Sequence, residues 1–232
     1  MTERTKQTIA LVDDDRNILT SVQMTLEAEG FNVRTYTDGE AALQGLTAYP
    51  VDLAVLDIKM PRMDGMELLQ RLRSRSNLPV IFLSSKNEEV DQLMGLRLGA
   101  DDYITTPFSP AELIARVDAL IRRLGVDEAE KDSVEVHSGP FLLNSRNRTL
   151  EKNGTRLKLT QIEYLLVKLF MENPGRAMSR EEILKAVWGA DFDGELKTVD
   201  VNIRRLRMKI EDDPTEPEYL TTVWGYGYKW GY

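Results

Sequence analysis

Short apolar runs alternate with longer amphipathic segments along the first half of the chain. The runs predict buried strands, and the segments between them carry apolar residues at helical spacing, as Leu113, Val117 and Leu120 do. Proline, glycine and aspartate mark the joints. We expect strands near 7–12, 32–36, 52–56, 79–84 and 102–105, and helices near 15–29, 39–47, 65–74, 87–97 and 110–123. This alternation predicts an α/β domain with a doubly wound parallel sheet.

The pattern changes after residue 124, where a short linker leads to a second unit. Residues 125–133, GVDEAEKDS, are polar and charged, which is typical of a linker. Residues 134–232 have apolar segments of their own and predict a small α+β domain. Its expected elements are strands around 134–158, helices over 160–172, 179–188 and 197–211, and a hairpin in the closing TTVWGYGYKWGY. We therefore expect domains over 1–124 and 134–232.

Aspartates stand at the ends of two predicted strands. Asp13 and Asp14 directly follow the apolar run 9–12, and Asp57 closes the run 53–56. Parallel strands bring such carboxylates to one edge of a sheet, where they repel one another unless a cation offsets their charge. Oxygen ligands favour Mg²⁺, which commonly holds a phosphate as well. Taken alone, the same acids are equally consistent with a solvated loop at the strand ends.

Four motifs in the first unit resemble the receiver domain of two-component response regulators. They are ALVDDDRNIL, LAVLDIKMPRMDGMELL, PVIFLSS and GADDYITTPFS, in the family's order and spacing. The resemblance implies a flavodoxin-like fold in which Asp57 accepts a phosphoryl group from a sensor histidine kinase. It also implies a Mg²⁺ site formed by Asp13, Asp14, Asp57 and the backbone carbonyl of Lys59.

Three further positions correspond to the residues that carry a receiver's response. Ser84 matches the hydroxyl that hydrogen-bonds to the phosphoryl group, and Tyr103 matches the aromatic residue that turns inward with it. Each alone would be an ordinary strand residue, and only the spacing from Asp57 favours the functional role. Thr106 departs from the family, which usually has lysine before this Pro-Phe pair. A short neutral hydroxyl does not replace that charge, so the resemblance predicts weakened or atypical switching.

The second unit resembles the winged-helix DNA-binding domain of the OmpR/PhoB class of response regulators. The segments that carry the resemblance are LTQIEYLLVKLFMENPGRAMSREEILKAVWG, TVDVNIRRLRMKIE and YLTTVWGYGYKW. The receiver motifs are most similar to those of ChvI-type regulators of alphaproteobacteria. The resemblance implies a cytoplasmic transcription regulator that binds double-stranded promoter DNA as a dimer and works with RNA polymerase.

The same resemblance implies a homodimer through the receiver's fourth helix, fifth strand and fifth helix. The charged residues expected to pair across its two-fold axis are Asp101, Asp102, Glu112, Arg116 and Arg123. Gln92 stands where a basic partner for Glu112 is usual, so we expect one ion pair to be missing. Because exposed pairs contribute only about 0 to 1 kcal/mol each, dimerisation should be weakened rather than lost.

A basic segment is the candidate DNA-binding surface, although the chain has a formal net charge of −8. Residues 197–209 hold five basic residues against one acidic residue. On a helix, Asn202, Arg205 and Lys209 would share one face, from which Arg205 could read guanine. The expected contacts are Trp188, Lys197, Thr198, Val201, Asn202, Arg204, Arg205, Lys209 and Lys229. The alternative is a solvated basic face. In the closing hairpin, Trp224 stands where relatives often have arginine.

Other features narrow the class of protein. The chain has no cysteine, which excludes a disulfide framework and a thiolate metal site. No apolar run approaches about 18 residues and the start MTERTKQ is unlike a signal peptide, so we expect no membrane span. The alternative function is a phosphoryl-transfer enzyme of the haloacid dehalogenase type. Those enzymes carry DxDx(T/V) after their first strand, whereas Asp57 follows the third predicted strand, which favours the regulator.

Overall fold

The computed structural model describes residues 7–85, 95, 98–125, 135–190, 192 and 195–231, with the backbone alone at 84, 85 and 123–125. The chain divides into two compact units, Met1–Ile121 and Arg122–Tyr232.

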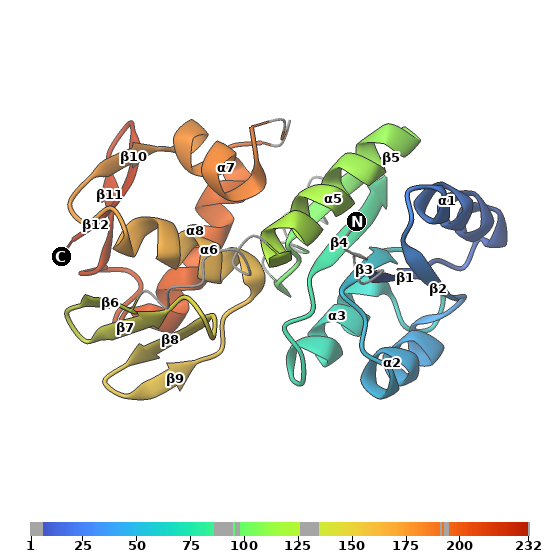
Figure 1. Ribbon diagram of the computed structural model, residues 1–232, viewed down its shortest axis with the longest axis horizontal. Coiled ribbons are helices and arrows are strands. Elements are labelled where there is room, and N and C mark those ends of the chain that lie inside the picture. The colour runs from blue at the N-terminus through green and yellow to red at the C-terminus, as the bar shows by residue number, and fades with distance from the viewer. Residues whose placement is uncertain are drawn as a thin grey trace, which may run out of the picture. The chain divides into compact units, whose positions relative to one another are not determined.

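The first unit is built on a parallel sheet of five strands in the order β2-β1-β3-β4-β5 (Figure 1). The strands are β1 (Thr8–Val12), β2 (Asn32–Tyr36), β3 (Leu53–Asp57), β4 (Val80–Ser85) and β5 (Asp102–Thr106). The described helices are α1 (Arg16–Ala28), α2 (Gly39–Ala48), α3 (Gly65–Arg73) and α5 (Pro110–Gly125). The chain leaves β1 in one direction and β3 in the other, so the switch point of the sheet lies between these two strands.

Helices cover both faces of this sheet, with α2 and α3 on one face and α1 and α5 on the other (Figure 1). Side chains of a strand alternate between the two faces. Val12 and Leu56 therefore join Leu68 of α3 in one core, while their neighbours Leu11 and Val55 are equally buried. Strands that are apolar on both sides are what a parallel sheet covered by helices requires.

The second unit combines two small antiparallel sheets with three helices. The first sheet has the order β6-β7-β8-β9, formed by β6 (Glu135–Ser138), β7 (Phe141–Asn144), β8 (Thr149–Lys152) and β9 (Thr155–Leu157). The helices are α6 (Gln161–Met171), α7 (Arg180–Trp188) and α8 (Lys197–Ile210). The second sheet has the order β10-β12-β11, formed by β10 (Ala177–Ser179), β11 (Leu220–Val223) and β12 (Gly227–Trp230).

Local hydrogen bonds explain where the helices of the second unit begin. Thr160 and Glu163 form a capping box at α6, in which each side chain bonds to the other residue's backbone N–H. The Ser179 hydroxyl caps α7 by accepting from the Glu182 N–H, while the Glu182 carboxylate pairs with Arg176. In the first unit, aspartate side chains cap α1, α2 and α3.

The fold class is confirmed: a flavodoxin-like α/β unit is followed by an α+β unit of winged-helix type. The described strands and helices of the first unit begin and end within one or two residues of their predicted bounds. The predicted helix 87–97 and the linker 125–133 fall almost wholly outside the described residues. Strand β10 was not predicted, since three residues are too few to show an alternating pattern.

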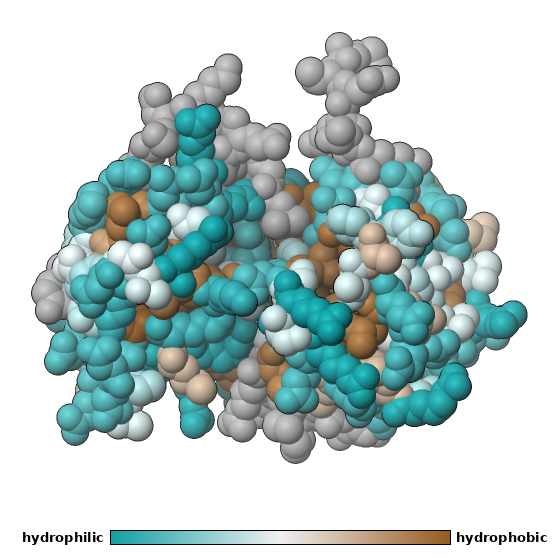
Figure 2. Space-filling view, turned by 90° about the horizontal axis from the view of Figure 1, so that it is seen from below, coloured by the Kyte–Doolittle hydropathy of each residue, from teal (hydrophilic) through white to brown (hydrophobic). Residues whose placement is uncertain are grey.

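The surface of the molecule is mostly polar on the face shown in Figure 2, where hydrophobic residues appear in smaller areas between hydrophilic ones. None of the helices in the described part of the chain is both long enough and apolar enough to cross a membrane.

Candidate functional site

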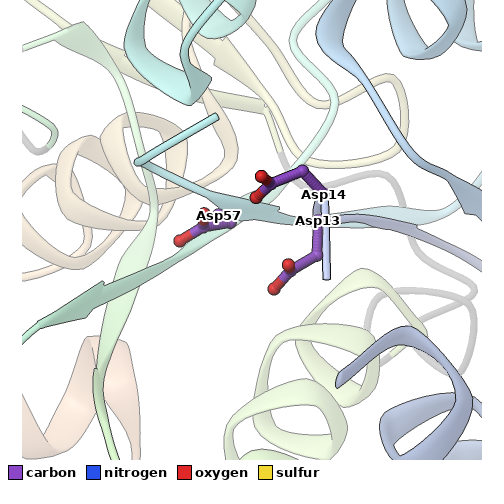
Figure 3. A group of neighbouring side chains, drawn as sticks. All are labelled: Asp13, Asp14 and Asp57. Atoms are coloured by element: carbon purple, nitrogen blue, oxygen red, sulfur yellow. The ribbon is translucent and has the colours of Figure 1, made fainter. Parts of the chain in front are cut away.

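Three aspartates meet at the carboxyl end of the parallel sheet (Figure 3). Val12 of β1 pairs with Leu56 of β3, so the next residue on each strand, Asp13 and Asp57, emerges at the same edge. Asp14 follows directly, and one carboxylate oxygen from each aspartate can be chosen so that all three lie within 4.8 Å of one another. This is the switch point of the sheet, where folds of this class bind their ligands.

The environment of these acids disfavours their charged forms. Burial, with the nearby charge of Asp13, raises the pKa of Asp57 to about 7, although the backbone N–H groups of Lys59 and Ile58 oppose the shift. Burial also raises the pKa of Asp13, and the Asp14 carboxylate adds to this effect. A divalent cation would reverse both shifts, because its charge stabilises the carboxylates. The all-oxygen donor set fits Mg²⁺.

The loop after β3 is held close to Asp57. The Gly65 N–H donates to the Ile58 carbonyl at 3.0 Å, and a Cβ at Gly65 would overlap the Asp57 carbonyl oxygen. Asp64 then caps α3 by accepting from the Glu67 N–H at 2.7 Å. Glycine at position 65 therefore lets α3 begin directly behind the Asp57 backbone.

Two of the remaining predicted receiver residues, Ser84 and Thr106, lie near the same edge of the sheet. Ser84 pairs with Thr105 across β4 and β5, and Thr106 ends β5. Tyr103 is half-buried against the core beneath α2 and α3. The structure brings Ser84 and Thr106 to the ends of neighbouring strands, whereas Tyr103 lies near the start of β5. The roles of all three, and that of the Lys59 carbonyl as a metal ligand, stay predictions.

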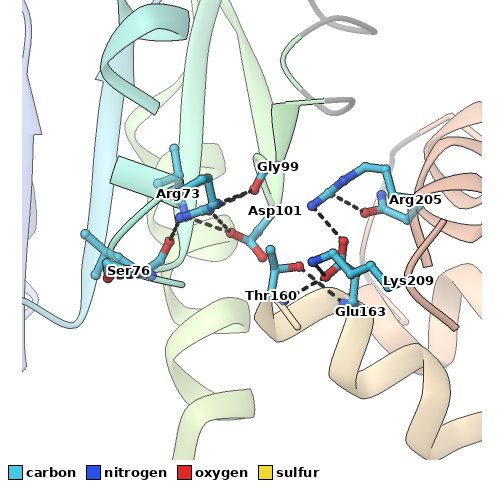
Figure 4. A network of polar contacts seen from close by, with 11 residues as sticks. Arg73, Ser76, Gly99, Asp101, Thr160, Glu163, Arg205 and Lys209 are labelled. Atoms are coloured by element: carbon cyan, nitrogen blue, oxygen red, sulfur yellow. Dashed lines mark hydrogen bonds and ion pairs between the residues drawn. The ribbon is translucent and has the colours of Figure 1, made fainter. Parts of the chain in front are cut away.

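Two of the acids predicted to pair across a dimer axis are instead internal. Asp101 is fully buried, accepts from the Val80 N–H at 2.8 Å and pairs with Arg73 at 3.3 Å (Figure 4). Asp102 is also buried and pairs with Arg116 at 3.3 Å. Both carboxylates are thus engaged within the first unit, and their pairing across a dimer axis stays a prediction. Gln92 and the Arg123 side chain lie outside the described residues.

In the second unit, α8 has a buried face and an exposed face. Val199, Ile203, Leu206 and Ile210 are buried, as predicted. The exposed or half-exposed side chains on the opposite side are Lys197, Val201, Arg204 and Met208. This spacing follows the helical repeat and gives α8 a continuous outer surface with two basic residues.

Several predicted DNA contacts are not exposed. Trp188, Thr198 and Asn202 are buried, and the Asn202 amide bonds to the Thr198 carbonyl and the Arg205 guanidinium. The prediction that Asn202 shares an exposed face with Arg205 and Lys209 is wrong, because these hydrogen bonds satisfy its amide inside the domain. Lys229 is exposed on β12.

Arg205 and Lys209 both reach a carboxylate on α6 (Figure 4). Glu163 is fully buried and lies 2.9 Å from the Arg205 guanidinium and 2.5 Å from the Lys209 ammonium. The Arg205 side chain is only 11% exposed. Periodicity could not reveal this arrangement, since Glu163 is 42 positions away in sequence and is also the capping residue of α6.

The β11–β12 hairpin is fastened to α8 by polar contacts at two levels. Asp200 accepts from the Tyr228 hydroxyl and from Arg180, each at 2.7 Å, and burial raises the pKa of Tyr228 to about 12. Arg207 donates to the Leu220 carbonyl and the Thr222 hydroxyl, each at 2.8 Å. The hairpin is thus held in a fixed position beside the exposed face of α8.

Glu211, the residue after α8, fixes the start of this hairpin. Its buried carboxylate accepts from the backbone N–H groups of Glu218, Tyr219 and Leu220 at 2.7 to 3.2 Å. The six-residue loop between these positions is thereby closed at its base.

Comparisons with known proteins cover both units. Residues 9–118 match the family described as "Response regulator receiver domain", and residues 154–230 match "Transcriptional regulatory protein, C terminal". The chain is 40% identical to the sensory transduction protein RegX3 of Mycobacterium tuberculosis, over 95% of this chain and 97% of that protein. It is 41% identical to the uncharacterized transcriptional regulatory protein YcbL of Bacillus subtilis, over 95% and 99%.

Two solved structures are also similar to almost the whole of this chain. The response regulator DrrB of Thermotoga maritima, described as an OmpR/PhoB homologue, is similar with a TM-score of 0.52 at 32% identity, over 97% of this chain and 99% of that chain. A mutant of the protein RitR is similar with a TM-score of 0.80 at 25% identity, over 97% and 98%.

Proposed function

Because the chain belongs to the OmpR/PhoB family of two-component response regulators, we propose that a sensor histidine kinase phosphorylates it on Asp57 and that it then binds promoter DNA as a dimer. The observation that carries the proposal is the convergence of Asp13, Asp14 and Asp57, whose oxygens approach within 4.8 Å at the switch point of the sheet.

In the proposed reaction, an Asp57 carboxylate oxygen attacks the phosphorus of a phosphohistidine. The bond from phosphorus to the histidine nitrogen breaks, the histidine leaves with the bonding electrons, and an acyl phosphate forms. Mg²⁺, held by Asp13, Asp14, Asp57 and the Lys59 carbonyl, would supply positive charge to the phosphoryl oxygens. Asp57 is assigned as the nucleophile because it is the last residue of β3. Asp13 and Asp14 lie close to its carboxylate, and Gly65 in the following loop packs against its backbone.

Phosphorylation by a small donor tests the assignment. With acetyl phosphate and Mg²⁺, the protein should gain one phosphoryl group, and Asp57→Asn should gain none when both are weighed by mass spectrometry. Asp15→Asn is a matched control, because an asparagine oxygen still caps α1 by accepting from the Asn17 N–H. A phosphoryl group on Asp57→Asn would overturn the assignment.

DNA recognition is proposed for the exposed face of α8. Lys197 and Arg204 would contact phosphates, and Val201 would meet a base in the major groove. Arg205 would read guanine by leaving Glu163, whose charge Lys209 continues to offset at 2.5 Å. When Arg205 moves from Glu163 to guanine, it gives up one charge-assisted contact and forms another. The net free-energy cost of this movement is therefore small compared with that of removing the guanidinium.

Further aspects rest on the family resemblance. They are the cytoplasmic location, the ChvI-type subfamily, the dimer through the receiver's fourth helix, fifth strand and fifth helix, and the contact with RNA polymerase. The homologues are transcription regulators, which favours this function over a haloacid dehalogenase-type phosphatase. Multiple turnover of a phosphate ester by the purified protein, lost in Asp57→Asn, would favour the enzyme instead.

A further inference from the structure

Arg205 occupies a position near the exposed face of α8, but its side chain turns inward. Its neighbours at helical spacing, Val201 and Met208, belong to the exposed face, and Met208 is 67% exposed. The Arg205 side chain is nevertheless only 11% exposed, because its guanidinium lies against α6 (Figure 4). A side chain of this length reaches either α6 or a DNA groove by rotation about its own bonds.

Two buried acceptors hold the Arg205 guanidinium in its inward position. Nη2 lies 2.9 Å from Oε1 of Glu163, and Nη1 donates to Oδ1 of Asn202 at 3.1 Å. Glu163 and Asn202 are both completely buried. An ion pair away from water is screened less than one at the surface, so opening it costs more free energy. The free domain therefore restrains Arg205, whereas the adjacent Arg204 is exposed.

The Glu163 carboxylate keeps other partners if Arg205 leaves. Its Oε2 atom accepts from the Lys209 ammonium at 2.5 Å and from the Thr160 N–H at 2.8 Å. Lys209 is itself fixed by a hydrogen bond of 2.8 Å to the Lys158 carbonyl. The negative charge of Glu163 would thus remain offset by Lys209 after Arg205 had turned outward. The arrangement allows two states of Arg205 in a folded domain, one held by Glu163 and one released.

We propose that Glu163 is an internal competitor of DNA for Arg205, and that this arginine is released only where guanine accepts it. The inference rests on the proposed DNA-binding function. A phosphate contact at the surface is screened by salt and does not offset the loss of a buried ion pair. The O6 and N7 atoms of guanine accept two N–H groups of one arginine and do offset it. Glu163 is then a positioning residue that lowers the affinity for DNA by acting through Arg205.

Binding to two duplexes tests the restraint. The specific duplex is enriched from a randomised pool by the full-length native protein, and the second duplex has a random sequence. Glu163→Gln should bind the specific duplex about tenfold more tightly with an unchanged salt slope, because Arg205 reaches guanine without leaving a carboxylate. It should bind the random duplex about threefold more tightly with a salt slope steeper by about one unit, because the freed arginine contacts a phosphate.

Glu172→Gln is the matched control for the loss of one negative charge. This residue follows the last residue of α6, and its side chain is 40% exposed, so the variant should bind both duplexes like the native protein. An equal gain in Glu172→Gln would overturn the proposal, because the effect would then follow net charge alone. Weaker binding of Glu163→Gln to the specific duplex would also overturn it, because the carboxylate would then orient Arg205 toward DNA.

A double variant shows whether the effect passes through Arg205. In an Arg205→Ala background, Glu163→Gln should change the affinity for either duplex by less than about twofold, because no arginine remains to be released. Lys209 keeps its hydrogen bond to the Lys158 carbonyl and does not replace it. If Glu163→Gln tightened binding equally in both backgrounds, Arg205 would not be the restrained group and the proposal would fail.

The native protein provides a measurement that does not depend on the stability of Glu163→Gln. The guanidinium NMR signals of Arg205, identified by their absence from Arg205→Ala, should be alike in the free protein and with the random duplex. The specific duplex should shift them. Equal signals in all three states, or equal shifts with both duplexes, would overturn the restraint alone. Failure of the native protein to bind any duplex would overturn the proposed function as well.

Discussion

The pKa of the Asp57 carboxyl group shows how the environment at the sheet edge changes the chemistry of a single residue. Burial and the neighbouring Asp13 raise its pKa to about 7, so the metal-free protein holds this side chain largely protonated in mildly acidic solution. An unfolded chain loses the same proton near pH 4. Between these two values the folded state binds the extra proton, and its free energy of unfolding falls as the pH rises.

Asp57→Asn should therefore stabilise the metal-free protein in a pH-dependent way. At pH 8, where native Asp57 is ionised in both states, the variant should gain roughly 1 kcal/mol or more, discounted from the full shift because the group is only partly buried. At pH 4 the difference should vanish. Urea unfolding in the presence of a chelator measures both values, with Asp15→Asn as control. A gain of equal size at both pH values would contradict the role of ionisation.

At the scale of elements, some features of α8 were predictable from the sequence pattern and others were not. Its core positions were predictable, because apolar residues recur at helical spacing and Val199, Ile203 and Leu206 are buried accordingly. The burial of Asn202 was not predictable from the pattern. A polar side chain is expected on the exposed face of a helix unless its buried hydrogen-bond partners are known. The pairing of Arg205 with Glu163 depends on packing of α6 against α8, which no local spacing encodes.

Glu163→Gln should destabilise the second unit. The amide keeps the volume and part of the capping box but leaves Arg205 and Lys209 without their buried counter-charge, at a cost of roughly 2 to 4 kcal/mol. Glu172→Gln, which alters a partly exposed pair with Lys168 at 4.0 Å at the end of the same helix, should change stability by less than about 0.5 kcal/mol. Chemical unfolding of both variants measures the difference. Equal stabilities would show that Glu163 does not anchor α8.

Two substitutions on α8 should affect DNA binding differently. Arg205→Ala should reduce the preference for a specific duplex over a random one by roughly 1 to 3 kcal/mol. Lys197→Ala should weaken binding to both duplexes alike and lower the salt slope by about one unit. Titrations of both duplexes at several salt concentrations distinguish these effects. If Arg205→Ala weakened both duplexes equally, guanine readout by this residue would be ruled out.

At the scale of the whole molecule, phosphorylation of the receiver is expected to shift an equilibrium between an inactive and an active state of the protein. A phosphoryl group shifts that equilibrium only as far as it interacts more favourably with the active state than with the inactive one. The strand ends that would sense the phosphoryl group carry Ser84 and Thr106, and Tyr103 lies further back along β5. The fold and the acidic site were predictable from motifs, whereas the internal use of Asp101 and Asp102 depends on tertiary packing around Arg73 and Arg116.

Thr106→Lys should strengthen the response to phosphorylation. A charge-assisted hydrogen bond contributes roughly 1.5 to 3 kcal/mol, which corresponds to about tenfold or more in the ratio of active to inactive states. The native protein and Thr106→Lys should be compared with and without beryllofluoride and Mg²⁺. Sedimentation measures the dimer fraction of each protein, and titration measures its affinity for a promoter duplex. A native protein that already responds as strongly as Thr106→Lys would show that another group supplies the missing charge.

The carboxylate of Glu211 has a consequence for how this chain tolerates change. By holding the backbone of Glu218, Tyr219 and Leu220, it closes the loop 212–217 at its base. The position of the hairpin is then independent of the length of that loop, because the loop is bypassed by the side chain. Insertions or tags placed between Asp213 and Pro217 should leave the β11–β12 hairpin in place beside α8. Deletion of Glu218 should weaken the attachment, because it brings Pro217, which has no backbone N–H, to a position that Glu211 holds.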